Sequence, residues 1–269
     1  MQLLKRAPVG WAMVLGAVAL LATSCEGVES TASASGSVST TTTTVTKVTY
    51  DASSRPYLAI RYLTRDGSDR YVLKTGPGVV RISAPTTNRG APGGSNTRAV
   101  VWPPYTKAAV EQQTCSRWTD AKGTWVQQGL VLRLRIDGSR LRSVVVAKNV
   151  VYGANWQFNV MTWDTGRRDV LQIHGAAILR TPFERNNVPR PLPWNVCART
   201  ERDIIRVKGW RKDAPEPSWH DKSHTGAVRL PAGWTVAGKA GWYGGHIAPG
   251  ATIGMSLLRT TATYPQTVS

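Results

Sequence analysis

The sequence has no apolar run long enough to cross a bilayer. Its longest such run, Val9–Ala22, has about 14 residues, whereas a membrane-spanning helix needs roughly 20. Lys5 and Arg6 precede this run, and small residues follow it. A basic start, a short apolar core and small residues at the end are typical of a secretory signal peptide. We therefore expect residues 1–24 to be a signal peptide and the protein to be exported.

Cysteine is scarce, with three residues in the chain. The first, Cys25, follows small residues in a pattern that resembles a bacterial lipobox, which implies cleavage before Cys25 and lipidation of its thiol. Plain secretion and a retained membrane anchor are the open alternatives. In an oxidising compartment an even pair of cysteines tends to form a bridge, so we predict a disulfide between Cys115 and Cys197.

Acidic residues are fewer than half as numerous as basic ones. The chain has 16 Asp and Glu against 34 Lys and Arg, a net charge of +18. The basic residues are spread through strand-like segments, so the whole body carries a positive field, which attracts polyanions and speeds their capture. Outside a cell these polyanions include uronic-acid polysaccharides, teichoic acids, anionic lipid surfaces and DNA. Charge that serves only solubility is the alternative.

Helical periodicity is almost absent, and one or two turns over Thr106–Gln113 are the only helix that we expect. Residues 25–47 are rich in Ser and Thr, cannot build a core, and are predicted to form a flexible tether. One β domain over 48–264 and a tail over 265–269 follow. Short alternating segments with Gly, Pro and Asp-Gly turns predict an all-β sandwich or jelly roll. The expected strands are 57–63, 71–74, 79–83, 98–102, 130–136, 141–147, 156–163, 170–174, 196–200, 204–210, 227–230, 239–243 and 252–258.

Successive side chains of a strand point to opposite faces, so alternation assigns each residue to the core or away from it. The residues expected to point inward are Leu132, Leu134, Ile136, Phe158, Val160, Leu171, Ile173, Ile205 and Val207. If these strands belong to one sheet, its outer face carries guanidinium, amide, imidazole and indole groups, which suit the hydroxyl and carboxylate groups of sugars. A solvated face with its indoles covered by loops is the alternative. The outward residues, which are candidate binding positions, are Arg133, Arg135, Gln157, Asn159, Trp163, Gln172, His174, Arg206, Lys208 and Trp210.

Three segments together resemble the alginate-lyase type of jelly-roll polysaccharide lyase. They are Gly78–Pro85 followed by Ser95–Arg98, the tripeptide Gln172–His174, and Lys239–Tyr243. The chain departs from that family after Arg98, where Glu and a second Arg are missing, and after Tyr243, where an Asn-Gln pair is missing. The segment 210–219 is more similar to concanavalin A-like modules. Both families share one architecture, so the resemblance implies an all-β, concanavalin A-like β-jelly-roll sandwich of two antiparallel sheets.

The resemblance to the lyases also implies a reaction, β-elimination in a uronate-containing chain. A proton leaves the carbon next to a carboxylate, and preorganised donors that neutralise the growing charge lower the barrier. By resemblance, Arg98 and Gln172 would neutralise this charge, and His174 would be the general base or a further donor. Tyr243 would be the general acid and a second candidate for the base. Lys239 would lie beside Tyr243 and support binding, and neither a metal nor another cofactor is required.

Other catalytic patterns are missing from the sequence. The glucanase pattern Glu-x-Asp-x-x-Glu, a zinc protease pattern, Gly-x-Ser-x-Gly and a phosphate loop do not occur. We therefore expect a monomeric protein, secreted or lipid-anchored on the outer face of the cell membrane, that binds an anionic polysaccharide. It needs no cofactor and has no specific nucleic-acid partner. A β-eliminating polysaccharide lyase and a non-catalytic structural lipoprotein of the cell envelope are the alternatives.

Overall fold

The computed structural model describes residues 43–52, 57–89, 96–150 and 156–267. All of them belong to one compact unit, residues 41–269. The predicted signal peptide, the lipobox residue Cys25 and most of the predicted tether lie outside the described residues. Within the described ranges, no helix is long and apolar enough to span a membrane.

Two antiparallel sheets account for nearly all of the regular structure. The strands of the eight-stranded sheet are β1 (Thr43–Asp51), β3 (Val72–Gly76), β4 (Val79–Ser83), β6 (Glu111–Lys122), β13 (Trp194–Glu201), β14 (Ile204–Arg211), β15 (Thr225–Arg229) and β17 (Thr252–Thr267). The strands of the seven-stranded sheet are β2 (Ala59–Thr64), β5 (Arg98–Trp102), β7 (Gln127–Asp137), β8 (Arg140–Lys148), β9 (Gln157–Asp164), β10 (Leu171–Ile178) and β16 (Lys239–Gly245). The remaining elements are the short helix α1 (Arg180–Phe183) and the hairpin of β11 (Glu184–Arg185) and β12 (Val188–Pro189).

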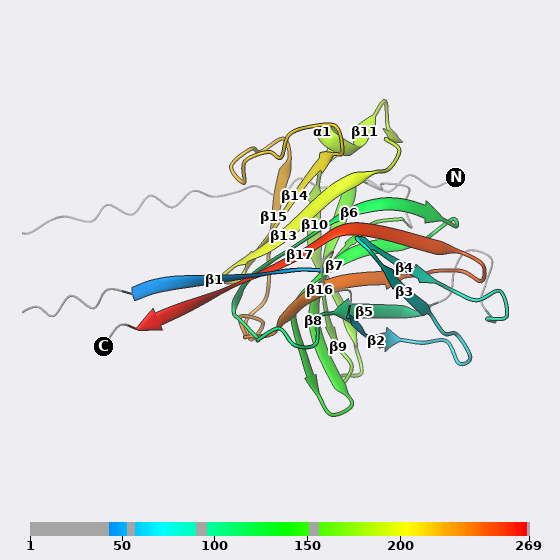
Figure 1. Cartoon of the computed structure of the whole chain (residues 1–269), viewed down its shortest axis with the longest axis horizontal. Helices are drawn as coiled ribbons and strands as arrows, with labels where there is room; N and C mark the ends of the chain where they lie inside the picture. The colour runs from blue at the N-terminus through cyan, green and yellow to red at the C-terminus, as the bar shows by residue number, and fades with distance from the viewer. Residues whose placement is uncertain (1–42, 53–56, 90–95, 151–155, 268–269) are drawn as a thin grey trace, which may run out of the picture. The chain divides into compact units, whose positions relative to one another are not determined.

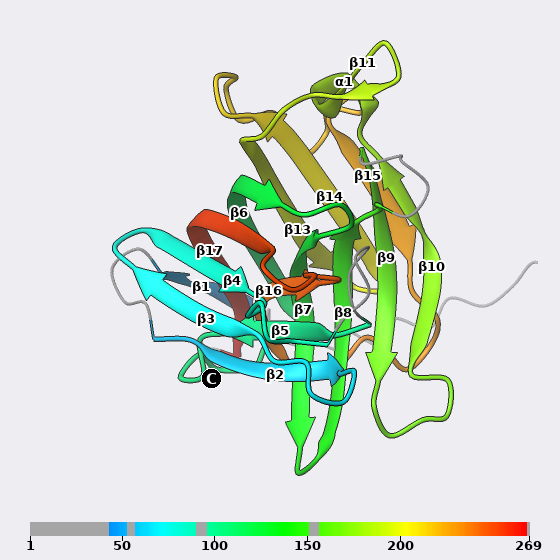
Figure 2. The ribbon, with the colours of Figure 1, turned by 90° about the vertical axis from the view of Figure 1, so that its right-hand side faces the viewer.

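The chain crosses repeatedly between the two sheets. The eight-stranded sheet has the order β15-β14-β13-β6-β17-β4-β3, with β1 paired to β17, and the seven-stranded sheet has the order β10-β9-β8-β7-β16-β5-β2. The two sheets lie against each other as layers, and β1 and β17 extend together as a ribbon (Figures 1 and 2). The predicted fold class, an all-β jelly-roll sandwich of two antiparallel sheets, is confirmed.

The main core lies between the two sheets, because alternate side chains of each strand are apolar and point inward. Trp118 and Val196 of the eight-stranded sheet and Phe158 and Trp242 of the seven-stranded sheet are all fully buried in it. The ring centres of Trp118 and Phe158 are 5.6 Å apart, which joins the two layers. Burial of one such side chain stabilises the fold by about 2–3 kcal/mol.

Three expectations about local structure were wrong. Thr43–Lys47 was assigned to the tether and Pro265–Thr267 to the tail, but both belong to strands, because Thr43–Lys47 of β1 pairs with Thr263–Thr267 of β17. Both are polar, and their strand structure depends on this long-range pairing rather than on apolar alternation. Thr106–Gln113 is not helical, because Ala109 forms a β-bridge with Gly238 and β6 begins at Glu111.

One buried cation gives the stability of the domain a specific pH dependence. Burial lowers the pKa of Lys148 from 10.5 to about 8, and its Nζ lies 5.9 Å from the centre of the Trp194 ring. Between these two pKa values the unfolded chain binds more protons than the folded one, so the free energy of unfolding rises with pH. We expect a gain of about 2 kcal/mol between pH 8 and pH 10 that Lys148→Met lacks. Urea unfolding of both proteins measures it, and equal pH slopes would contradict the assignment.

Candidate ligand-binding face

The outer face of the eight-stranded sheet gathers side chains from β6, β13, β14 and β17. Val196, Ala198, Ile205 and Val207 point into the core, so the residues between them point outward. We call this outer surface the basic face. The strand register aligns its side chains in rows, which are Trp210, Asn195 and Arg117; Lys208, Cys197, Cys115 and Arg259; Arg206, Arg199, Gln113 and Thr261; and Glu111 and Thr263. Glu201 follows Arg199 by two residues on the same face of β13.

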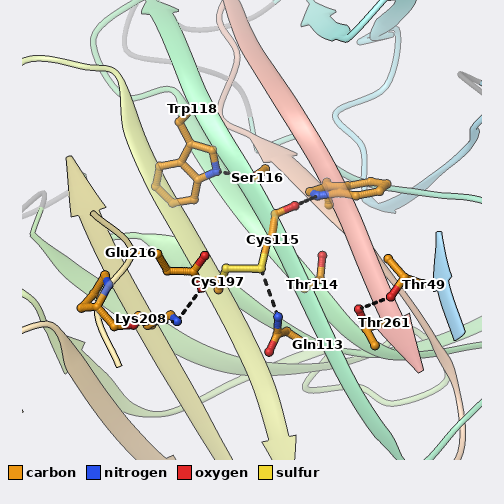
Figure 3. Close-up of a disulfide and its surroundings, with 12 residues drawn as sticks. Thr49, Gln113, Thr114, Cys115, Ser116, Trp118, Cys197, Lys208, Glu216 and Thr261 are labelled. Carbon is orange, nitrogen blue, oxygen red and sulfur yellow. Dashed lines mark hydrogen bonds and ion pairs between the residues drawn. A yellow bond between two sulfur atoms is a disulfide. The ribbon is translucent and has the colours of Figure 1, made fainter. Parts of the chain in front are cut away.

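The Cys115–Cys197 disulfide lies at the centre of the basic face. The two residues are directly paired across β6 and β13, and their Cα atoms are 4.1 Å apart. Directly paired residues project from the same face of a sheet, which brings the two sulfur atoms together. Figure 3 shows the bridge between Gln113 and Lys208. The predicted disulfide is confirmed.

The loop after β14 folds over part of the basic face and is held there by Lys208. The Lys208 ammonium lies 2.7 Å from Glu216 Oε1 and donates to the Pro217 carbonyl oxygen at 2.9 Å. It also lies 4.5 Å from the centre of the Trp219 ring, and the Arg199 guanidinium lies 4.3 Å from the same ring. Only 3% of the Lys208 side chain is exposed. Lys208 was predicted to bind substrate, but the loop covers it, so it positions the loop instead.

Glu216→Gln should loosen this loop. The substitution leaves the buried Lys208 ammonium without its carboxylate, and we expect a loss of only about 1 kcal/mol in unfolding free energy because Glu216 itself is exposed. Hydrogen exchange in residues 212–219 should become faster. Asp213→Asn is the matched control, since its ion pair with Arg211 is exposed on both sides. Equal effects of the two substitutions would contradict the role of Lys208.

A first hollow of about 250 Å³ opens between this loop and β17. Arg117, Lys212 and Arg259 line it, together with the Trp210 side chain and the disulfide. Among the described residues, none of these three cations takes part in an ion pair. Glu216 is the only carboxylate among the described residues of the lining, and Lys208 already engages it. The first hollow is therefore a positively charged site beside an indole.

The Asn195 side chain fixes one of these cations in place. Arg117 Nε donates to Asn195 Oδ1 at 2.9 Å, and Asn195 Nδ2 donates to the Arg211 carbonyl oxygen at 3.2 Å. Because Nε is used in this way, the two terminal nitrogens of the Arg117 guanidinium are left to bind a ligand. A guanidinium presents these donors in a fixed planar fork that matches a carboxylate or a sulfate.

A second hollow of about 430 Å³ follows on the same face and has a balanced charge. Lys47 and Arg199 line it together with Glu111 and Glu201. Burial opposes ionisation of Glu201, but its hydrogen bond from Arg206 Nε, at 2.5 Å, and the charge of Arg199 hold its pKa below the ordinary value. Glu201 is therefore ionised at neutral pH, and the second hollow does not favour an anion.

Of the four residues predicted for the lyase reaction, Arg98 and Tyr243 interact with each other, but His174 and Gln172 lie elsewhere, beside Thr162 of β9. Tyr243 is fully buried, its hydroxyl donates to Gln127 Oε1 at 3.1 Å, and burial raises its pKa. It belongs to a second apolar cluster on the outer face of the seven-stranded sheet. His174 Nε2 contacts Thr162 Oγ1 at 2.8 Å, on the opposite face of that sheet. A buried general acid cannot reach a leaving oxygen, so the predicted lyase arrangement was wrong.

Arg98 and Gln172, the other two members of the set, are separated from each other. Arg98 lies on the face that carries Tyr243, with one terminal nitrogen 2.8 Å from His246 Nε2 and its guanidinium 5.5 Å from the Trp163 ring centre. Gln172 is exposed on the edge strand β10 and pairs with Thr162. The bulge between Ile173 and Gly175 shifts the register at His174. Leu171 and Ile173 were predicted to be core residues, but Leu171 is half-buried and Ile173 is 59% exposed.

A second bulge explains the errors on β7. The register shifts between Leu132 and Arg135, and Arg133 has a φ of 53°. Arg133 was predicted to face a ligand, but it is fully buried and donates to the carbonyl oxygens of Trp234, at 2.9 Å, and Arg202. The shift also turns Leu134 to the second apolar cluster rather than the main core. Ile136, the third expected core residue, is exposed.

The remaining predicted binding residues divide between the two sheets, so they do not share one face. Trp210 and Arg206 lie on the basic face, and Arg206 is paired with Glu201. The others belong to the seven-stranded sheet, where Trp163 is buried, Arg135 is exposed, Gln157 and Asn159 are half-buried, and Lys239 donates to the Pro104 carbonyl oxygen. Sequence reasoning missed Arg117, Asn195, Arg199, Lys212, Trp219 and Arg259. The apolar alternation of Val196 and Ala198 could have indicated Asn195 and Arg199.

A third hollow, of about 590 Å³, lies between the β1–β17 ribbon and residues 105–107. Tyr50, Tyr105 and Tyr264 line it, and the rings of Tyr50 and Tyr105 meet edge to face at 5.1 Å. Lys107 is the only cation in its lining, and no carboxylate is present there among the described residues. This hollow therefore does not have the charge that would attract a polyanion. The described residues also contain no group of three or more His, Cys, Asp or Glu that could hold a metal ion.

No protein-family model and no curated protein matches the chain. Similar solved structures include the carbohydrate-binding module CBM66 from Bacillus subtilis, with 8% identity, a TM-score of 0.44 and coverage of 74% of this chain and 94% of that one. A prokaryotic β-1,3-1,4-glucanase (lichenase) derived from a mouse hindgut metagenome has 6% identity, a TM-score of 0.45 and coverage of 81% and 99%. A Bacillus subtilis protein of unknown function with a galectin-like fold has 9% identity, a TM-score of 0.46 and coverage of 76% and 89%. At these identities and TM-scores, the likenesses carry no argument about function.

Proposed function

We propose that this protein is an exported glycan-binding protein whose basic face binds an anionic polysaccharide. One observation carries the proposal. The first hollow brings Arg117, Lys212 and Arg259 together without an ion pair to any described carboxylate, next to the indole of Trp210. Clustered cations without carboxylate partners attract anions, and an indole offers a flat apolar surface for the ring of a sugar.

The chemistry of each side chain suits an acidic sugar. The free guanidinium nitrogens of Arg117 can bind a carboxylate or a sulfate in a bidentate way, and the Lys212 ammonium adds a point charge. The net charge of +18 draws a polyanion toward the protein from a distance. Because these groups are open to solvent, binding should weaken as the salt concentration rises.

The proposed location rests on the N-terminal sequence. A signal peptide over residues 1–24 and a lipid on Cys25 would place a monomeric domain on the outer face of the cell membrane, and secretion without the lipid remains the alternative. Either location gives the basic face access to extracellular polysaccharides. We propose that the membrane is reached only through the lipid anchor and that neither a cofactor nor a specific nucleic acid takes part.

Binding can be tested with the purified domain, residues 43–269. Isothermal titration with the polyuronate alginate and with a neutral glucan should give heat only for alginate. Trp210→Ala should weaken alginate binding about tenfold, since stacking by one aromatic side chain contributes on the order of 1 kcal/mol or more. Trp125→Ala is the matched control, because Trp125 is 46% exposed in the connection between β6 and β7. Equal binding of alginate and the neutral glucan, or no binding of any anionic polysaccharide, would overturn the proposal and leave a structural envelope protein.

A further inference from the structure

We infer that the basic face binds an extended polysaccharide chain parallel to β6, with an anionic unit in the first hollow and an uncharged unit in the second. This inference rests on the proposed function. It names the class of polymer, a chain in which acidic and uncharged sugars alternate, rather than one with a charge on every unit.

The two hollows form one continuous path on the basic face. Gln113 lines both of them, and the disulfide lines the first hollow on the same strands. Along β6 the outward residues run from Arg117 through Cys115 and Gln113 to Glu111, so the path follows the strand direction. A strand rises about 3.3 Å per residue, which places Arg117 and Gln113 roughly 13 Å apart along β6. A ligand that fills both hollows is therefore a chain of several sugar units.

The sides of this path limit the direction of the chain. The loop 212–219 lies over β13 and β14, where Trp219 covers Lys208 and Arg199. On the other side, β17 carries the row of Arg259 and Thr261, whose hydroxyl contacts Thr49 of β1 at 3.1 Å. A chain that ran across the strands would meet the loop, whereas a chain along β6 passes beside it.

The charges of the two hollows differ, and this difference gives the specificity. Among the described residues, the first hollow has three cations without an ion pair and one carboxylate, Glu216, which Lys208 engages, whereas the second has two cations and two carboxylates. Glu201 is neutralised by Arg199 and Arg206, but Glu111 is exposed and forms no ion pair among the described residues. An acidic unit next to Glu111 would be repelled, and repulsion of the wrong ligand is a common source of specificity. An uncharged unit is not repelled.

The test compares two polymers and their oligosaccharides on the same domain. Hyaluronan alternates a uronate with an uncharged amino sugar, and alginate has a uronate at every unit. For hyaluronan oligosaccharides, we expect the affinity to rise with length until both hollows are spanned and then to stay constant. Glu111→Gln should strengthen alginate binding about fivefold and leave hyaluronan binding within twofold. Asp137→Asn, which removes a carboxylate from the exposed β7–β8 turn, should change neither.

The extended path and the alternation of acidic and uncharged units can each be overturned separately. A disaccharide that binds as tightly as a long chain would overturn the extended path. Equal gains for both polymers with Glu111→Gln, or no gain for either, would overturn the alternation. In both cases the wild-type domain still binds, so the proposed function stands. Failure of the wild-type domain to bind either polymer would overturn the proposed function and the inference together.

Discussion

Replacement of Arg117 and Arg259 together by Gln lowers the affinity for an anionic polysaccharide about 100-fold. A hydrogen bond to a charged group contributes roughly 1.5–3 kcal/mol, and two such groups are removed from the first hollow. The fold should tolerate the change, because Arg259 is exposed and Arg117 is half-exposed. Titration of both proteins with the same polymer at low and at physiological salt measures the effect.

The control for this variant removes the same amount of charge elsewhere. Arg70 and Arg185 are exposed and form no ion pair among the described residues. Their replacement by Gln reduces the net charge equally, so it tests the long-range field alone. We expect a loss of less than threefold, since exposed charges are largely screened at physiological salt. Equal losses for the two double variants would show that overall charge, and not the first hollow, determines binding.

Removal of the Cys115–Cys197 disulfide by a double Ser substitution lowers the unfolding free energy by about 4 kcal/mol. The bridge joins residues 82 positions apart, and closure of so long a loop restricts the unfolded chain strongly. For a domain of this size, the loss corresponds to a fall in Tm of about 8–16 °C. Urea unfolding and thermal scans measure both quantities.

The same variant separates stability from binding. The disulfide lines the first hollow, and we expect β6 and β13 to stay paired without it, because they are paired from Trp194 to Arg199. Binding measured well below the new Tm should therefore fall less than fivefold. Added reductant should destabilise the wild-type protein and leave the double variant unchanged. A change in unfolding free energy below about 1 kcal/mol would contradict the loop-closure account.

Much of the fold could be predicted from alternation within single strands. The segments 79–83 and 98–102 were predicted with the bounds that the structure shows, because apolar residues alternate or follow one another between turn residues. The outward direction of Arg206, Lys208 and Trp210 was also predicted correctly from the apolar Ile205 and Val207 between them. Alternation is a local property, so the sequence alone can reveal it.

The errors arise where structure depends on distant parts of the chain. The bulges on β7 and β10 insert a residue, and each one moves the following side chains to the other face. Nothing in the local pattern marks Arg133 as the inserted residue. The sheet to which a strand belongs is also a non-local property. For that reason Trp163 and Trp210 were predicted on one face, although they lie in different sheets.

The lyase motifs also depend on distant parts of the chain. Gln172–His174 and Lys239–Tyr243 are short segments whose chemistry depends on where their strands are placed. The structure places Tyr243 in an apolar cluster and His174 on the other face of the sheet. The cations of the basic face had no motif to indicate them, because β6, which supplies Arg117, alternates polar with buried residues that are themselves partly polar.

The most direct test of the basic face is amide hydrogen exchange of the domain with and without a bound anionic polysaccharide. We predict slower exchange in the loop 212–219 and in residues 255–260 of β17, which border the first hollow. Exchange in β5, β9 and β16 should be unchanged. Protection confined to those three strands of the seven-stranded sheet, with none in the loop 212–219, would contradict the assignment of the basic face as the binding site.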